Sequence, residues 1–188
     1  NDVAIRLMKL GGLKVTLDGV LVLVAMTHRT QERNRADALA RLLDLIRQGR
    51  IRLDKNVHKG RRFTFHDSCK HGRELAAHYG KGYFDEPREI VAACVEDFVE
   101  MTPTREKNFC CGAGGGMWPM PFEQQSAWHA RYKYQQIKDS GADVVVVGCS
   151  NCRDQIMRRI PKFYPDCTYE VKYIWQLVAE ALVIEPWE

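Results

Sequence analysis

The sequence predicts an α/β fold with parallel sheets, and two features carry that prediction. Strand patterns and helix patterns alternate along the 188 residues, as in chains whose helices cross over between parallel strands. The run ADVVVVG, residues 142–148, is aliphatic throughout its centre, which is typical of a strand buried on both faces of a parallel sheet. In such sheets functional residues collect beyond the carboxyl ends of the strands.

Strands are expected where β-branched and aromatic residues run together, and helices where apolar residues recur every three or four positions. The expected strands are residues 20–25, 61–67 and 142–148. The expected helices are residues 35–49, 73–80, 85–99, 123–138, 151–160 and 172–182. Three of these helices are expected to end at a glycine, namely Gly49, Gly80 and Gly141.

Composition excludes several classes of protein. The net charge of +4 is small and the basic residues are scattered between acidic ones, so no nucleic-acid partner is expected. The longest apolar run, Gly19 to Met26, is too short to span a bilayer, so no direct membrane insertion is expected. Clustered cysteines in an odd total of seven suit a reducing compartment, which predicts a cytoplasmic location.

Five cysteines follow predicted strands or lie in a glycine-rich loop. Cys69 comes just after the second predicted strand, and Cys149 and Cys152 directly follow the third. Cys110 and Cys111 open the loop CCGAGGG. Because the carboxyl ends of parallel strands share one edge of the sheet, we expect these five thiols to converge on one site.

Subsets of these cysteines have other interpretations. A CxxC pair after a strand is also typical of a thioredoxin-like redox pair or of half a zinc site, and adjacent cysteines can be two unrelated core residues. A structural zinc site takes four ligands, so a fifth convergent thiolate exceeds its needs and suits a cluster of several irons. The other two cysteines, Cys94 and Cys167, are expected to be core or surface thiols.

The glycines of the loop suit a cluster as well. Without side chains, the backbone can approach a bound group closely, and its N–H groups can donate to sulfur. The candidate cofactor-binding glycines are Gly112, Gly114, Gly115 and Gly116.

Three motifs resemble the cysteine-rich CCG domain of heterodisulfide reductase catalytic subunits and their relatives, namely HDSCK, CCGAGGG and GADVVVVGCSNC. The resemblance implies that a non-cubane four-iron four-sulfur cluster, with zinc as the alternative, is held by Cys69, Cys110, Cys111, Cys149 and Cys152. Within the family, CCGAGGGMWPMPFE and GCSNCRDQIMRRIPKFY are most similar to the K subunit of the Dsr sulfite-reduction membrane complex and to the similar subunit of tetrahaem cytochrome complexes.

The family usually carries this domain twice, and a weak internal repeat indicates a degenerate other copy in the N-terminal part of this chain. A shift of 124 residues aligns GVLVLVAMTHR with DVVVVGCSNCR. Ala25 and His28 then stand where Cys149 and Cys152 stand in the other copy. The same shift would put the partner of the glycine loop before residue 1, so we expect a first half that is truncated.

We therefore predict two Rossmann-like pseudo-repeats with parallel sheets. Residues 1–60 form a degenerate, incomplete half without cysteines, and we expect it to bind no metal. Residues 61–188 form the cysteine-rich CCG domain with the cluster site. Any two strand-helix units of an α/β protein would align about as well, which is the alternative to a duplication.

The resemblance implies an oxidoreductase subunit that reduces or forms a disulfide or trisulfide on a small partner protein. Such bonds take two electrons, and the family supplies electrons from a ferredoxin-like domain with cubane clusters. We expect as partners the other subunits of a quinone-linked membrane complex, with the chain peripheral on the inner face of the cell membrane. The alternatives are an electron-relay subunit that binds no substrate and a structural zinc-binding domain.

Three residues beside the cysteines are candidates for the chemistry. His66 and Asp67 precede Cys69, and Arg153 follows Cys152, so each can protonate or orient a leaving thiolate. Each position also suits a helix cap or a solvated surface residue, and for Arg153 that is the commoner outcome.

Overall fold

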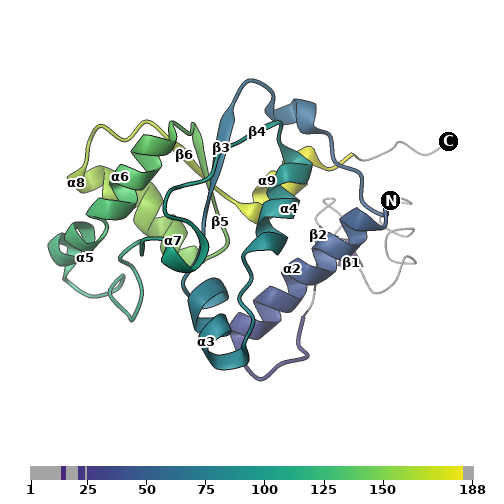
Figure 1. Cartoon of the computed structure of the whole chain (residues 1–188), viewed down its shortest axis with the longest axis horizontal. Coiled ribbons are helices and arrows are strands. Elements are labelled where there is room, and N and C mark those ends of the chain that lie inside the picture. The colour runs from purple at the N-terminus through teal and green to yellow at the C-terminus, as the bar shows by residue number, and fades with distance from the viewer. Residues whose placement is uncertain (1–13, 16–20, 24, 184–188) are drawn as a thin grey trace.

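A four-stranded parallel sheet forms the centre of the computed structural model, which describes residues 14–15, 21–23 and 25–183 (Figure 1). The strands, in the order β4-β3-β5-β6, are β4 Asp97–Phe98, β3 Arg62–His66, β5 Val144–Val147 and β6 Glu170–Tyr173. All three pairings between neighbours are parallel. The predicted α/β class with a parallel sheet is thus confirmed.

Helices cover both faces of this sheet (Figure 1). On one side lie α2 Gln31–Arg47, α4 Asp85–Cys94 and α9 Ile174–Ala181. On the other side lie α5 Glu123–His129, α6 Arg131–Ser140, α7 Ser150–Asp154 and α8 Ile160–Phe163. The short α3, Leu75–Tyr79, follows β3 near the carboxyl edge of the sheet. The described residues also include two 3₁₀ turns, η1 Lys55–His58 and η3 Arg105–Lys107, and two π-helical turns, η2 Lys70–Glu74 and η4 Gln155–Arg159.

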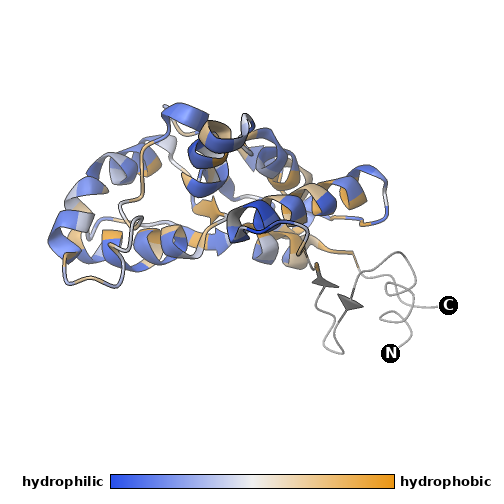
Figure 2. Cartoon of the chain, turned by 90° about the horizontal axis from the view of Figure 1, so that it is seen from below, coloured by the Kyte–Doolittle hydropathy of each residue, from blue (hydrophilic) through white to orange (hydrophobic). Residues whose placement is uncertain are grey.

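The valines of β5 divide between two hydrophobic cores. Val144 and Val146 pack into the core shared with α2, α4 and α9. Val145 and Val147 pack into the core on the opposite face, with residues of α6 and α7. This is the burial on both faces that the aliphatic run predicts, because successive side chains of a strand point to opposite faces. In Figure 2 hydrophobic and hydrophilic stretches alternate along the helices, as expected of helices with one face packed on a core.

Local sequence sets the helix ends. Thr30 caps α2, its hydroxyl accepting from the Arg33 N–H at 3.4 Å. Gly80 and Gly141 end α3 and α6 in the left-handed conformation, at φ +73° and +62°, as predicted. Gly49, also at positive φ, follows α2 within two residues.

Two strands lie where the apolar pattern predicted helix. α4 ends at Cys94, and Phe98 pairs with Phe63 of β3 instead of extending the helix face. At the other edge β6 pairs with β5, so the last helix begins at Ile174 and not at Lys172. A neighbouring strand supplies backbone partners that a local pattern cannot reveal, and here that pairing overrides the helical periodicity.

The helices around the glycine loop are less regular than predicted. The helix expected at 123–138 is divided into α5 and α6 at Ala130. The helix expected at 151–160 runs from Ser150 to Phe163 through the π-helical turn η4. Both irregular stretches lie against Gly112: a Cβ on that glycine would be 3.4 Å from the Ala130 nitrogen and 3.2 Å from the Gln155 amide. The interruptions therefore accompany close packing of the loop.

The first part of the chain pairs differently from the expected parallel half. β1 Lys14–Val15 and β2 Leu21–Val22 form a two-stranded antiparallel sheet, whereas parallel strands would need a longer crossover connection than five residues. The rest of the strand expected at 20–25 lies partly outside the described residues. α2 packs into the core beside β3 and β5, so residues before and after position 60 share one hydrophobic core. The internal duplication stays a prediction.

Among the described residues, no helix is both long enough and apolar enough to cross a membrane.

Candidate metal centre

The register of the sheet brings the predicted cysteines to one edge. His66, the last residue of β3, pairs with Val147, the last residue of β5. Cys69 and Cys149 follow within three residues of these strand ends. Both thiols therefore emerge at the carboxyl edge of the same parallel pair.

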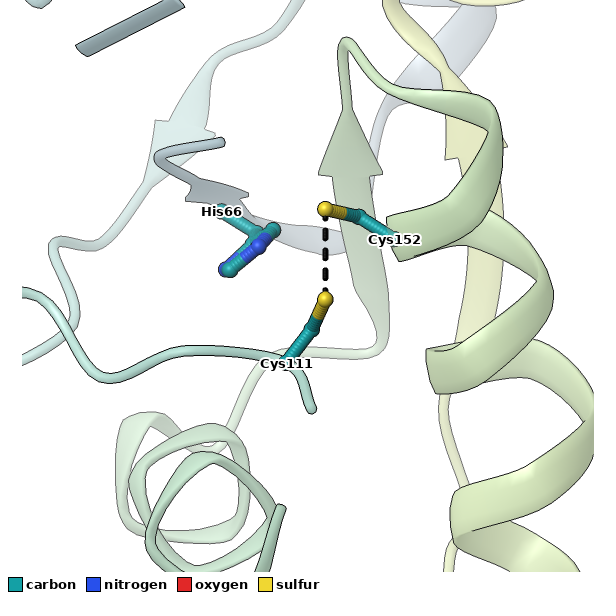
Figure 3. A group of neighbouring side chains, drawn as sticks. All are labelled: His66, Cys111 and Cys152. Atoms are coloured by element: carbon teal, nitrogen blue, oxygen red, sulfur yellow. Dashed lines mark hydrogen bonds between the residues drawn. The ribbon is translucent and has the colours of Figure 1, made fainter. Parts of the chain in front are cut away.

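The five predicted thiols interact in a continuous chain. The Sγ atoms of Cys111 and Cys152 lie 3.3 Å apart (Figure 3). Cys110 interacts with Cys111 and with Cys69, and Cys152 interacts with Cys149. The structure thus brings all five together, although 40 positions of sequence lie between Cys69 and Cys110.

The two remaining cysteines do not join this chain of thiols. Cys94 packs in the core formed with α2 and α9, where burial raises the pKa of its thiol to about 12. Cys167 is half-buried and interacts with Tyr169. Their environments agree with the structural roles expected of them.

Protons are unevenly distributed along the thiol chain. Interaction with the Cys111 and Cys69 thiols holds the pKa of Cys110 far below its usual value, and the Gly112 N–H adds a hydrogen bond at 3.3 Å. Interaction with Cys152 lowers the pKa of Cys149 to about 5. The pKa values of the three donor thiols are raised in turn, that of Cys111 to about 12. A metal bound by all five sulfurs would displace the protons that the thiols carry.

The glycine loop approaches the following helix closely at Gly112. This residue has φ +87°, and a Cβ there would lie 2.5 Å from the Ser126 carbonyl oxygen. The Ser126 hydroxyl donates to the Gly112 carbonyl at 2.9 Å, which holds the loop against α5. Gly115 and Gly116 also have positive φ, whereas Gly114 does not and has open space beside it.

Replacing Gly112 by alanine is expected to lower the free energy of unfolding of the metal-free chain by about 2–5 kcal/mol. A non-glycine residue in the left-handed region costs about 1–2 kcal/mol, and an overpacked methyl group costs about 1–3 kcal/mol. Gly114→Ala is the matched control and should change little, because nothing lies within 4 Å of the added methyl. Urea unfolding followed by circular dichroism measures both variants. Equal stabilities for the two would contradict the packing described for Gly112.

His66 is a buried neutral imidazole that faces the thiols (Figure 3). Burial, and then the nearby Lys133 ammonium, hold the pKa of His66 well below its usual value. A ring nitrogen of His66 and the Sγ atoms of Cys111 and Cys152 all lie within 4.8 Å of one another. Nε2 has no hydrogen-bond partner among the described residues although it is buried.

The amide of Asn108 determines where the His66 proton lies. The Lys133 ammonium can only donate, and it donates to Asn108 Oδ1. The amide nitrogen of Asn108 therefore faces the other way, donating to the Asp67 carbonyl at 2.7 Å and lying 3.5 Å from His66 Nδ1. Nδ1 acts as the acceptor, so the proton of the neutral ring is on Nε2, the atom without a partner.

Asp67 and Arg153 are both engaged by protein groups. The Asp67 carboxylate is buried and accepts two hydrogen bonds from Arg88, at 2.7 and 2.9 Å, and one from the Arg105 N–H at 3.0 Å. Arg153 pairs with Asp154 at 2.6 Å, and its guanidinium lies 4.8 Å from the centre of the Tyr173 ring. Asp67 thus joins the end of β3 to α4 and to the segment that leads into the glycine loop.

Three buried polar residues of the site were not predicted from the sequence: Arg88, Asn108 and Lys133. Lys133 had a visible signal, because it stands between Ala130 and Ile137 on the buried face of α6. Arg88 had a similar signal, since it stands between Phe84 and Val91 on the buried face of α4, whereas Asn108 had none. Arg88 lies 21 positions from Asp67 and Asn108 lies 25 positions from Lys133, so only the fold pairs them.

The donor set suits an iron-sulfur group better than a single zinc ion. Five interacting thiols exceed the four ligands of a closed tetrahedral zinc site. Several irons need more thiolate ligands, and backbone N–H groups near the sulfurs, such as that of Gly112, are typical of such clusters. The unpartnered Nε2 of His66 and the Gly112 N–H, which donates to the Cys110 sulfur, would both border the bound group.

Comparison with known proteins agrees with this site. The cysteine-rich domain family CCG matches residues 63–157, a span that includes all five cysteines. A subunit of the dihydromethanophenazine:CoB–CoM heterodisulfide reductase from Methanosarcina mazei is 34% identical over 145 residues, which are 77% of this chain and 33% of that protein. EtfAB:quinone oxidoreductase from Syntrophomonas wolfei is 33% identical over 107 residues, which are 56% of this chain and 13% of that protein.

A third relative is the iron-sulfur subunit of the Hdr-like menaquinol oxidoreductase from Archaeoglobus profundus. It is 36% identical over 75 residues, which are 39% of this chain and 12% of that protein. The chain thus spans about a third or less of the length of these relatives. The family match extends over half of the chain and contains the whole thiol site, so the chain belongs to the cysteine-rich CCG domain family.

Proposed function

We propose that the chain is the iron-sulfur part of an Hdr-like oxidoreductase that reduces, or forms, a disulfide or trisulfide on a small partner protein. The observation that carries the proposal is the continuous chain of thiol interactions at one sheet edge. The residues that would hold a non-cubane four-iron four-sulfur cluster are Cys69, Cys110, Cys111, Cys149 and Cys152. When bound, such a group supplies electrons one at a time to a bond that takes two.

The surrounding residues would orient the substrate sulfur and supply a proton. His66 carries its proton on Nε2, which is buried and has no partner among the described residues, so this N–H can donate to a departing thiolate. Asp67 acts through its bonds to Arg88 and Arg105, which hold the approach to the glycine loop. Arg153, in the last turn of α7, would orient the same sulfur.

The names of the relatives support a proposal about the partners of the whole protein. Their names include heterodisulfide reductase, menaquinol oxidoreductase and EtfAB:quinone oxidoreductase. We propose that the chain works with other subunits of a quinone-linked membrane complex and receives electrons through a ferredoxin-like domain with cubane clusters. It would then lie on the inner face of the cell membrane. A function in sulfate reduction, as in the Dsr-type complexes, stays a prediction from the resemblance.

Anaerobic reconstitution tests this proposal. The chain is incubated with iron and sulfide, and bound metal is measured together with the electron paramagnetic resonance spectrum of the oxidised protein. We expect bound iron and sulfide and a paramagnetic signal that changes when a small thiol, 2-mercaptoethanol, is added. Binding of zinc in preference to iron would overturn the assignment of an iron-sulfur cluster to this site. A cluster whose signal ignores the thiol would identify an electron relay instead of a catalytic site.

A further inference from the structure

Lys133 is a buried cation that has no acidic hydrogen-bond or ion-pair partner among the described residues. Its side chain, on α6, is fully buried. The ammonium donates to Asn108 Oδ1, to Gln136 Oε1 and, at 3.4 Å, to the sulfur of Met101. All three acceptors are uncharged, and no carboxylate of the described residues forms an ion pair with this lysine. An ammonium ion in such surroundings is costly unless a negative charge lies nearby.

Lys133 is joined to the thiol site through Asn108. The amide nitrogen of Asn108 lies 3.5 Å from His66 Nδ1, and a ring nitrogen of His66 lies within 4.8 Å of the Cys111 and Cys152 sulfurs. Burial lowers the pKa of Lys133 to about 7, and the groups that oppose this shift are Asp67, Cys111, Cys152 and Cys110. The carboxylate of Asp67 is already neutralised by Arg88. Another cation, Arg73, faces Cys69, but its side chain is only half-buried and donates to the Asn108 carbonyl at 2.6 Å. The fully buried charge of Lys133 therefore lies next to the residues that line the thiol site.

We propose that Lys133 sets the reduction potential of the group held by the five cysteines, as a buried positive charge that favours the reduced state. This inference rests on the proposed iron-sulfur function. Reduction by one electron adds one negative charge to the bound group, and Lys133 in its ammonium form, inside a low-dielectric interior, stabilises that added charge. The polar contacts of Lys133 include no thiol, so its effect is electrostatic, transmitted across Asn108 and the protein interior.

The hydrogen bonds of Lys133 also give it a structural role, and the loss of that role would have a different experimental result from the loss of its charge. Through Asn108 the lysine anchors the residues just before Cys110 to α6. Loss of an anchor alone would lower stability or iron content, but it would not move the potential of the cluster that remains bound. The potential therefore separates the charge of Lys133 from its hydrogen bonds.

The test compares Lys133→Met with the reconstituted unmodified chain in a redox titration with dithionite, followed by electron paramagnetic resonance. At the midpoint potential of the unmodified chain, the ratio of reduced to oxidised cluster should fall about tenfold or more in the variant. A tenfold change corresponds to a midpoint about 59 mV more negative for one electron. Lys138→Met is the matched control, because Lys138 is on the same helix but exposed and paired with Asp166 at 2.5 Å. Its midpoint should not move.

A second variant, Lys133→Gln, removes the charge but keeps an N–H donor for Asn108, and it should show the same shift. A normal iron content with an unchanged midpoint in either variant would overturn the inference while leaving the proposed function intact. Loss of iron in both variants, with iron retained in Lys138→Met, would make Lys133 a structural anchor and would also overturn it. Failure of the unmodified chain to bind iron would instead defeat the proposed function itself.

Discussion

Replacing Cys111 by serine is expected to abolish stable iron binding by the reconstituted chain. Cys111 is buried, and its sulfur lies at the middle of the thiol chain, 3.3 Å from that of Cys152 and in contact with Cys110. A serine hydroxyl at this place is a poor iron ligand, because it hardly ionises and is harder than a thiolate. Substitution of a residue that hydrogen-bonds to a metal ligand already lowers metal affinity roughly 10–100-fold. Loss of the ligand itself should therefore lower the affinity further.

The measurement is iron and sulfide per chain after anaerobic reconstitution and removal of unbound metal. Cys167→Ser is the control: Cys167 is half-buried and interacts with Tyr169 outside the thiol chain, so this variant should keep its iron. Circular dichroism of both metal-free variants checks that each has folded. Equal iron contents in the two would show that Cys111 is no ligand and that the site needs a different donor set.

Replacing Asp67 by alanine is expected to lower the free energy of unfolding of the metal-free chain by about 3–5 kcal/mol, because it leaves a buried charge without its partner. The carboxylate accepts two hydrogen bonds from Arg88, whose side chain is only 9% exposed. Glu100 remains beside Arg88 but is itself 36% exposed, so it compensates the charge incompletely. The backbone N–H of Arg105 would also lose its acceptor.

Urea unfolding measures this loss, and Glu89→Ala provides the control. Glu89 accepts from Arg47 in a similar two-pronged pair, but there both side chains are about half exposed. Solvent already screens that pair, so its removal should change stability little. If Asp67→Ala were as stable as Glu89→Ala, the network around Arg88 would not be what holds the approach to the glycine loop.

Features that depend on short stretches of chain were predictable. The run of valines in β5 is buried on both faces, as its composition predicts, and helices end at Gly80 and Gly141, where glycine takes the left-handed conformation. The cysteines were recognisable for a similar reason. Each one follows a strand or lies in the glycine loop, and parallel strands present their carboxyl ends at one edge. Convergence of the five thiols followed from those two local facts.

Features that depend on distant partners were not predictable. Phe98 belongs to a strand only because β3 offers it a backbone ladder, and Tyr173 is in β6 only because β5 does. The helix predicted over residues 123–138 is interrupted at Ala130, where Gly112 of the preceding glycine loop packs against it. Such pairings cost loop-closure entropy, and the burial of side chains offsets that cost. Neither quantity can be read from the local periodicity of the sequence.

Residue type and spacing were enough to establish the fold class, the five thiols and the glycine loop. What surrounds the thiols depended on the folded arrangement. It assigns Asp67 to Arg88 and directs the Asn108 amide nitrogen toward His66, and it encloses Lys133 among neutral acceptors. These outcomes depend on which buried charge meets which partner, and a chain with 28 basic and 24 acidic residues offers too many pairings for local pattern to choose between them.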